Sequence, residues 1–150
     1  MKKNFYNFLL STAILAIFVL IATATGQEEA EKKVAEQIKN EPAMQVTSVD
    51  LYEAYEANEV SADKKYKEKT LEVSGKVIDI RKNSIDESEI IVTLNGLIDN
   101  EYEIMGISCY FDASHTDETA TLSKGQNIKI LGLCDGKLMG VNLKGCSIKK

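Results

Sequence analysis

Apolar and polar residues alternate with a period of two along most of the second half of this chain. This alternation is typical of strands that bury one face. It predicts five strands, at Thr70–Ile80, Glu89–Leu94, Ile104–Phe111, Asn127–Cys134 and Lys137–Ile148. Asn95-Gly96 ends the second strand, and Asp135-Gly136 predicts a tight turn before the fifth. Gly75, inside the first strand, predicts a bulge or a sharp bend that lets one long strand serve two sheets.

A helical spacing of apolar residues comes before the first strand. Thr47 is predicted to cap this helix, and Asp50 three residues later completes a capping-box-like pair. The helix is expected to end near Asn58, and Glu59–Lys69 then leads into the first strand. Helical spacing favours core packing over a ligand-stacking surface for three tyrosines, Tyr52, Tyr55 and Tyr66.

A second, shorter helix is predicted between the third and fourth strands. Ser114 and Asp117 are suited to cap it, and it extends through Leu122. Five strands, a glycine-bent first strand and this intervening helix together describe an OB-fold barrel. The predicted fold is therefore mainly β, a five-stranded OB-fold barrel with a short helix between strands 3 and 4, preceded by an N-terminal helix.

Six short motifs, taken as a set, are distinctive. They are Tyr52–Asn58 (YEAYEAN), Ala62–Tyr66 (ADKKY), Leu71–Val77 (LEVSGKV), Cys109–Phe111 (CYF), Lys124–Gln126 (KGQ) and Gly132–Cys134 (GLC). With them the chain closely resembles the tRNA_anti-like family, small bacterial OB-fold proteins that are often exported. The resemblance runs from about Val49 to Ile148, and the acidic loop Asp99–Glu103 and a missing glycine in Lys67–Lys69 depart from it. It implies the OB fold and no established activity.

The first 26 residues have the three-part pattern of a secretory signal peptide. Lys2 and Lys3 precede an apolar run over Phe8–Ala24, and small residues follow in Ala22–Gly26. Cleavage after Ala24 or Gly26 is expected, which places the mature chain outside the cytoplasm, periplasmic or secreted. The alternative is an uncleaved membrane anchor formed by residues 8–24. Lipidation is rejected because no cysteine precedes Cys109.

The chain is expected to divide into three parts. Residues 1–26 form the signal peptide or anchor, residues 27–46 a charged helical linker, and residues 47–150 the OB-fold domain with its leading helix. The linker carries Glu28 and Lys32 at helical i,i+4 spacing, and Pro42 closes its helix.

The charge balance disfavours nucleic acid as a partner. The net charge is -5 for the whole chain of 150 residues. Thr70–Lys150 holds 9 basic and 12 acidic residues, with Tyr102, Tyr110 and Phe111 as its aromatic side chains. OB-folds that bind single strands combine a basic groove with exposed aromatic residues, and this stretch has the opposite charge.

Three cysteines offer a disulfide or a nucleophile. We predict a bond between Cys134 and Cys146, which end the fourth and fifth strands. Strand alternation opposes this pair, because it places the Cys146 side chain on the same side of the strand as polar residues. A bulge at Gly145 would turn Cys146 to the other side. The alternative pair is Cys109 with Cys146, since the third and fifth strands are neighbours in this barrel. Cys109 alternates with Ile107 and Phe111, so a buried apolar role is favoured over catalysis with His115.

The single histidine lies among carboxylates, Asp112, Asp117 and Glu118, which suggests a divalent-metal site at His115. No second histidine or fixed ligand spacing supports it, and carboxylates also suit the first turn of a helix. We therefore predict no metal, no cofactor and no catalytic residue.

These observations favour an exported, non-enzymatic binding module. Its docking surface is expected on one barrel face and two loops, around Ile80–Glu89 and Asp135–Met139. The partner is an unidentified protein or small molecule, and contact with a membrane is expected only through an uncleaved N-terminal segment. The alternatives are a single-stranded nucleic-acid-binding OB protein and a thiol- or metal-dependent enzyme.

Overall fold

A computed structural model describes residues 26, 28–97 and 106–149. By its internal contacts the chain separates into two compact units, residues 1–33 and 34–150. Residues 1–25 of the predicted signal peptide lie outside the described residues. The charged segment is helical over residues 28–40 and ends before Pro42, as predicted. Within the described residues no helix combines the length and the hydropathy needed to cross a bilayer.

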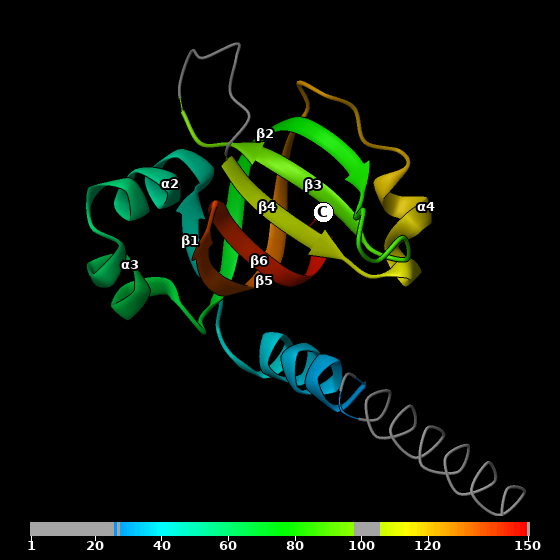
Figure 1. Ribbon diagram of the computed structural model, residues 1–150, viewed down its shortest axis with the longest axis horizontal. Coiled ribbons are helices and arrows are strands. Elements are labelled where there is room, and N and C mark those ends of the chain that lie inside the picture. Colours follow the sequence, from blue (N-terminus) through cyan, green and yellow to red (C-terminus); the bar gives the residue numbers. More distant parts are fainter. Residues whose placement is uncertain (1–25, 27, 98–105, 150) are drawn as a thin grey trace, which may run out of the picture. The chain divides into compact units, whose positions relative to one another are not determined.

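Five strands form a closed barrel (Figure 1). They are β2 (Thr70–Lys82), β3 (Ile90–Asn95), β4 (Gly106–Phe111), β5 (Asn127–Leu138) and β6 (Gly140–Lys149). The neighbours run in the order β2-β3-β4-β6-β5, and β5 returns to pair with β2. The β4–β6 pair is parallel and the other pairs of the barrel are antiparallel. This order confirms the predicted five-stranded OB-fold barrel.

The long strand β2 pairs with two neighbouring strands, as predicted. Residues Thr70–Lys76 pair with β5, and Val77–Lys82 pair with β3. The register shifts after Val77, two residues beyond the glycine where a bulge or bend was expected. The structure requires a glycine at position 75 for another reason, because a Cβ there would collide with the side chain of Ser48.

The predicted tight turn at Asp135-Gly136 is wrong. Strand β5 continues to Leu138, and the chain reverses at Met139, whose φ is 64°. Gly136 has a φ of 88° and lies where the β5–β6 register shifts, so it forms a bulge inside the strand. A glycine at positive φ suits a bulge as well as a turn, which explains the misinterpretation.

Two helices follow a short strand ahead of the barrel. Strand β1 (Met44–Thr47) pairs in parallel with β2, and helix α2 (Ser48–Ala57) follows it directly. The Thr47 cap is confirmed, since its hydroxyl oxygen accepts a hydrogen bond from the Asp50 amide at 3.0 Å. Helix α3 (Glu59–Tyr66), which the sequence pattern did not predict, follows Asn58, whose side chain caps it.

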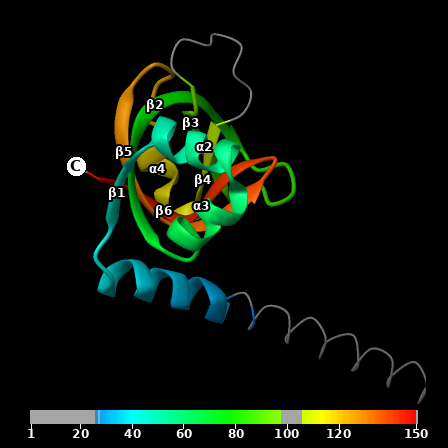
Figure 2. The same ribbon diagram turned by 90° about the vertical axis from the view of Figure 1, so that its left-hand side faces the viewer.

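Helices lie at both ends of the barrel. Figure 2 shows α2 and α3 across one end, and Figure 1 shows α4 (Thr116–Thr119) at the other. The short 3-10 helix η1 (Ala113–His115) precedes α4 and is capped by Asp112, whose carboxylate accepts from the Ser114 amide at 2.8 Å. The predicted helix is therefore present, but Asp112 caps it rather than Ser114 or Asp117, and it ends at Thr119 rather than Leu122.

The core combines the inward positions of the strands with one side of α2 and α3. The predicted tyrosines are part of it, with exposed fractions of 1 % for Tyr55, 4 % for Tyr66 and 8 % for Tyr52. Their burial confirms a packing role. Ring centroids of Tyr55 and Tyr66 are 6.4 Å apart, so the two helices are joined by an aromatic contact.

Candidate functional site

The outward side of β2, β3 and β4 is the face on which OB-folds take ligands. Strand pairing places its side chains in two rows. Arg81, Ile91 and Tyr110 are opposite one another and form the first row. The second row is made by Asp79, Thr93 and Ser108, and Asn142 of the neighbouring strand β6 extends it. We call these seven residues the β2–β4 face.

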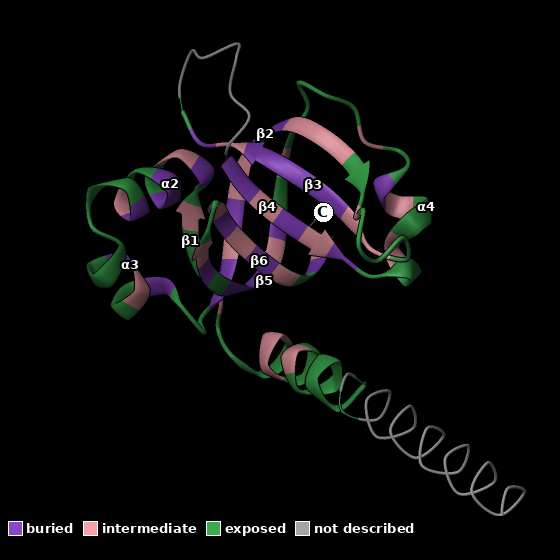
Figure 3. Cartoon of the chain, viewed as in Figure 1, coloured by how far each residue is buried: buried purple, intermediate pink, exposed green. Residues whose placement is uncertain are grey.

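The centre of the β2–β4 face is shielded although it points away from the core. Val92 and Leu94 belong to the core, so alternation directs Ile91 and Thr93 outward. Yet Ile91 is only 2 % exposed and Thr93 only 6 %. Figure 3 shows β3 as the most continuously buried strand along this face. Long flanking side chains such as Arg81 and Tyr110 therefore border an apolar and neutral centre.

One carboxylate offsets part of the positive charge at the β2–β4 face. The Asp79 carboxylate lies 3.5 Å from the Arg81 guanidinium and 2.8 Å from the Lys124 ammonium. One acidic group thus offsets part of the charge of two cations that would otherwise attract phosphate. The face carries a single aromatic side chain, Tyr110.

Other lysines of the barrel are paired as well. Lys129 lies 3.3 Å from Glu72, and Lys144 lies 2.6 Å from Asp135. Lys137 lies 2.6 Å from Glu56, and this hydrogen bond lowers the pKa of the Glu56 carboxyl and raises the pKa of Lys137. Such pairs reduce the counterion release that drives binding to a polyanion.

The two loops predicted as docking elements carry exposed apolar tips. In the β2–β3 loop, the Asn83 amide donates to the Glu89 carboxylate at 2.7 Å, and Ile85 is 95 % exposed. In the β5–β6 turn, Leu138 is 79 % and Met139 86 % exposed. Isolated exposed apolar residues are common, so these tips add contact area to the face without defining a ligand.

A separate hollow of about 600 Å³ lies on β2, β5 and β6. Its lining includes Ser74, Asn127, Lys129 and Lys149. It shares no residue with the β2–β4 face.

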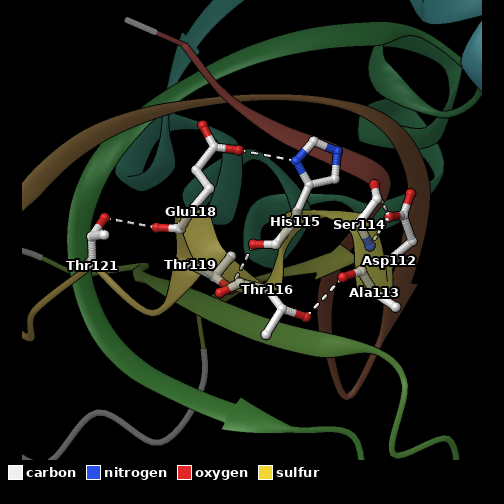
Figure 4. A network of polar contacts seen from close by, with 8 residues as sticks. All are labelled: Asp112, Ala113, Ser114, His115, Thr116, Glu118, Thr119 and Thr121. Atoms are coloured by element: carbon white, nitrogen blue, oxygen red, sulfur yellow. Dashed lines mark hydrogen bonds and ion pairs between the residues drawn. The ribbon is translucent and has the colours of Figure 1, made fainter.

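The acidic cluster around His115 is a helix start (Figure 4). His115 Nδ1 is 2.9 Å from the Glu118 carboxylate. Asp112 accepts from the amide and hydroxyl of Ser114, which lowers the pKa of its carboxyl. Within the described ranges, no three His, Cys, Asp or Glu side chains come together in a way that suits a metal ion.

All three cysteines are free thiols and all are buried. Cys134 lies 3.5 Å from the Tyr55 hydroxyl, and burial raises the pKa of its thiol. Cys109 donates to the Ile107 carbonyl oxygen at 3.8 Å. Cys146 lies beside Cys109. A buried, protonated thiol is a poor nucleophile, so these surroundings do not resemble a thiol enzyme site. Of the two pairs that the sequence offered, Cys134–Cys146 and Cys109–Cys146, the second joins thiols that are neighbours here.

Comparisons with known proteins concern the family and the fold of the chain. The family model described as tRNA_anti-like matches residues 1–148. A lipoprotein of Klebsiella pneumoniae whose suggested role is nucleic-acid binding has a similar structure, with a TM-score of 0.59 and 20 % identity. That match covers 72 % of this chain and 92 % of the other. The Stn1–Ten1 complex of S. pombe matches with a TM-score of 0.38 and 16 % identity, covering 54 % of this chain and 58 % of the other. No curated protein matches the chain significantly.

Proposed function

This chain belongs to the tRNA_anti-like family of OB-fold proteins, and from this premise we propose that it is an exported, non-enzymatic module that binds a protein on its β2–β4 face. The observation that carries the proposal is the first row of that face. There Ile91 lies between the Arg81 and Tyr110 side chains, and the second row beside it contributes neutral Thr93 and Ser108. Arginine and tyrosine are enriched in protein interfaces, and here they border a neutral centre that is itself closed to solvent.

The charge pattern supports a protein ligand over a nucleic acid. The Asp79 carboxylate contacts both Arg81 and Lys124, so part of the positive charge at the face is already offset. A groove for single strands needs a continuous positive track and several stacking residues. Among the described residues of the face, Tyr110 is the one aromatic side chain.

Nucleic-acid binding is the second candidate, because one observation favours it. Arg81 and Tyr110 flank Ile91 in register, and an arginine with a tyrosine is a pair that can stack on a base. The suggested role of the Klebsiella lipoprotein is of this kind. At 20 % identity, that similarity shows the fold alone.

Export is supported by the sequence of the first 26 residues. A positive start, an apolar run and small residues before Gln27 are the features that signal peptidase reads. The similar Klebsiella protein is itself a lipoprotein. A non-enzymatic role is supported by the cysteine and His115 surroundings, where helix capping and burial account for the reactive groups.

Site-specific photo-crosslinking tests this function. A benzophenone amino acid replaces Tyr110 on the face, and the same amino acid replaces Val60, which is 69 % exposed on α3, as the matched control. Irradiation of producing cells should give a discrete adduct from position 110 that protease removes and nuclease does not. A second change, Ser108→Arg, should abolish it.

Three results would contradict the proposal. A nuclease-sensitive adduct from position 110 would favour the second candidate. Equal adducts from positions 110 and 60 would show that the face has no special role. Absence of any adduct from position 110 would mean that no protein is held there.

A further inference from the structure

Cys109 and Cys146 come from neighbouring strands of the barrel. Strands β4 and β6 run parallel, and their last paired residues are Cys109 and Leu143. Cys146 follows three residues later on β6 and is 1 % exposed, while Cys109 is fully buried. Both side chains belong to the same apolar core.

Gly145 explains how Cys146 reaches the core. By simple alternation Cys146 would share the side of Asn142 and Lys144, which are not in the core. Gly145 has a φ of 61°, a left-handed conformation that interrupts the alternation and turns the next side chain inward.

The opposite strand leaves room for the Cys146 sulfur. A Cβ on Gly132 of β5 would lie 2.8 Å from Cys146 Sγ, closer than atoms can approach. The space in front of Gly132 is therefore filled by this thiol. Gly145 turns the side chain inward, and Gly132 accommodates it.

The two thiols face each other, and the third is held elsewhere. Cys146 Sγ interacts with the Cys109 thiol and with the Tyr110 amide, and burial together with Cys109 raises the pKa of Cys146. Cys134 instead contacts the Tyr55 hydroxyl of α2 at 3.5 Å. The geometry therefore gives Cys146 one cysteine neighbour, Cys109.

We propose that Cys109 and Cys146 form a disulfide bond between β4 and β6 when the chain folds in an oxidising compartment, and that Cys134 stays a thiol. The cellular part of this inference rests on the proposed export, because such bonds persist outside the cytoplasm. The pairing itself rests only on the barrel geometry.

The reaction is a thiol–disulfide exchange, and its oxidant is a small disulfide or a disulfide oxidoreductase. One cysteine thiolate attacks the oxidant disulfide, which forms a mixed disulfide and releases one thiol. The second cysteine thiolate then attacks the protein sulfur and releases the second thiol. The protein loses two protons and two electrons, and the oxidant is reduced to two thiols. Both sulfurs are buried in the folded barrel. We therefore expect the exchange to occur during folding, before β6 pairs with its neighbours and closes the barrel.

Oxidative refolding of the purified full chain tests the pairing without any cell compartment. The reduced, denatured chain is refolded with oxidised and reduced glutathione, alkylated without reduction, digested and mapped by mass spectrometry. We expect one crosslink, Cys109 to Cys146, and one alkylated residue, Cys134. Cys134→Ala should keep the crosslink, whereas Cys109→Ala and Cys146→Ala should each lose it. The folded, reduced chain in the same buffer should stay reduced.

The outcomes separate this inference from the proposed function. A Cys134–Cys146 or Cys109–Cys134 crosslink would overturn the pairing, and three alkylated cysteines after refolding would overturn the bond. Oxidation of the folded chain as fast as the refolding one would overturn its formation during folding. If the crosslink forms in vitro but the chain is found in the cytoplasm, the export proposal fails and the pairing stands.

Discussion

The hydroxyl of Tyr55 joins three elements at one end of the barrel, and its removal tests how α2 and α3 are attached. Tyr55 of α2 donates to the Asp63 carboxylate of α3 at 3.0 Å and contacts Cys134 of β5 at 3.5 Å. Tyr55→Phe keeps the ring, so no cavity forms. A hydrogen bond to a charged acceptor contributes about 1.5–3 kcal/mol. The Asp63 side chain is 32 % exposed and water can replace part of the bond, so we expect a loss of about 1.5 kcal/mol, the lower end.

The pH dependence gives the same variant a second signature. Burial, and then the hydrogen bond with Cys134, raise the pKa of Tyr55 well above its usual value. Because the Tyr55 pKa is higher in the folded state, the contribution of the protonated hydroxyl to stability is fully present below about pH 10. It is lost at higher pH, because the tyrosine of the unfolded chain releases its proton first. The loss is about 1.4 kcal/mol per pH unit. The stability difference between the wild-type protein and Tyr55→Phe should therefore nearly vanish at about pH 11.

Urea unfolding at neutral pH and near pH 11 measures both effects. Tyr66→Phe is the control, because Tyr66 is 4 % exposed in the same aromatic pair and its hydroxyl has no hydrogen bond to the described residues. Its cost should stay within about 0.5 kcal/mol. Equal stability of Tyr55→Phe and the wild type at neutral pH would refute the reasoning, as would an equal cost of the two variants.

Three further predictions concern other parts of the chain. Gly75→Ala should destabilise by about 1–3 kcal/mol in urea, since its Cβ meets Ser48, and Ser48→Gly should recover part of the loss. Thr47→Ala should cost about 1 kcal/mol because the Asp50 amide loses its cap, and an unchanged urea midpoint would contradict the cap. Mass spectrometry of the exported protein should find an N-terminus at Thr25 or Gln27, whereas an intact Met1 in the membrane pellet would contradict cleavage.

The barrel strands were predictable because most of them alternate buried and exposed residues, and β3 is a short apolar run bounded by Asn95-Gly96. Elements with a weaker apolar pattern were missed. In α3 the buried side chains are Ala62 and Tyr66 among mostly polar residues, so its helical period is not visible in the sequence. Strand β1 has four residues and is held by pairing with β2, a long-range contact that local pattern does not encode. The prediction of a turn at Asp135-Gly136 was wrong because the positive φ of Gly136 belongs to a bulge inside the strand.

The candidate sites were predictable only in part. The face and loops follow from the fold, but the near-complete burial of Ile91 and the double role of Asp79 depend on strand register. Alternation correctly directed Cys109 inward. The position of Cys146 depends on the backbone of Gly145, which the sequence suggested as a bulge without indicating which thiol it would face.

Titration of the full chain with a single-stranded oligonucleotide, at low and at physiological salt, tests the central claim most directly. Fluorescence anisotropy with a labelled oligonucleotide reports affinity, and amide NMR shifts of Ile91 and Thr93 report the surface used. With 12 acidic against 9 basic residues over Thr70–Lys150, and Asp79 offsetting part of the charge of Arg81 and Lys124, we predict a Kd no tighter than about 1 mM at physiological salt, against about 10⁻⁴–10⁻⁶ M for non-specific binders. A salt-sensitive micromolar Kd with shifts on the β2–β4 face would contradict the claim and identify a nucleic-acid site.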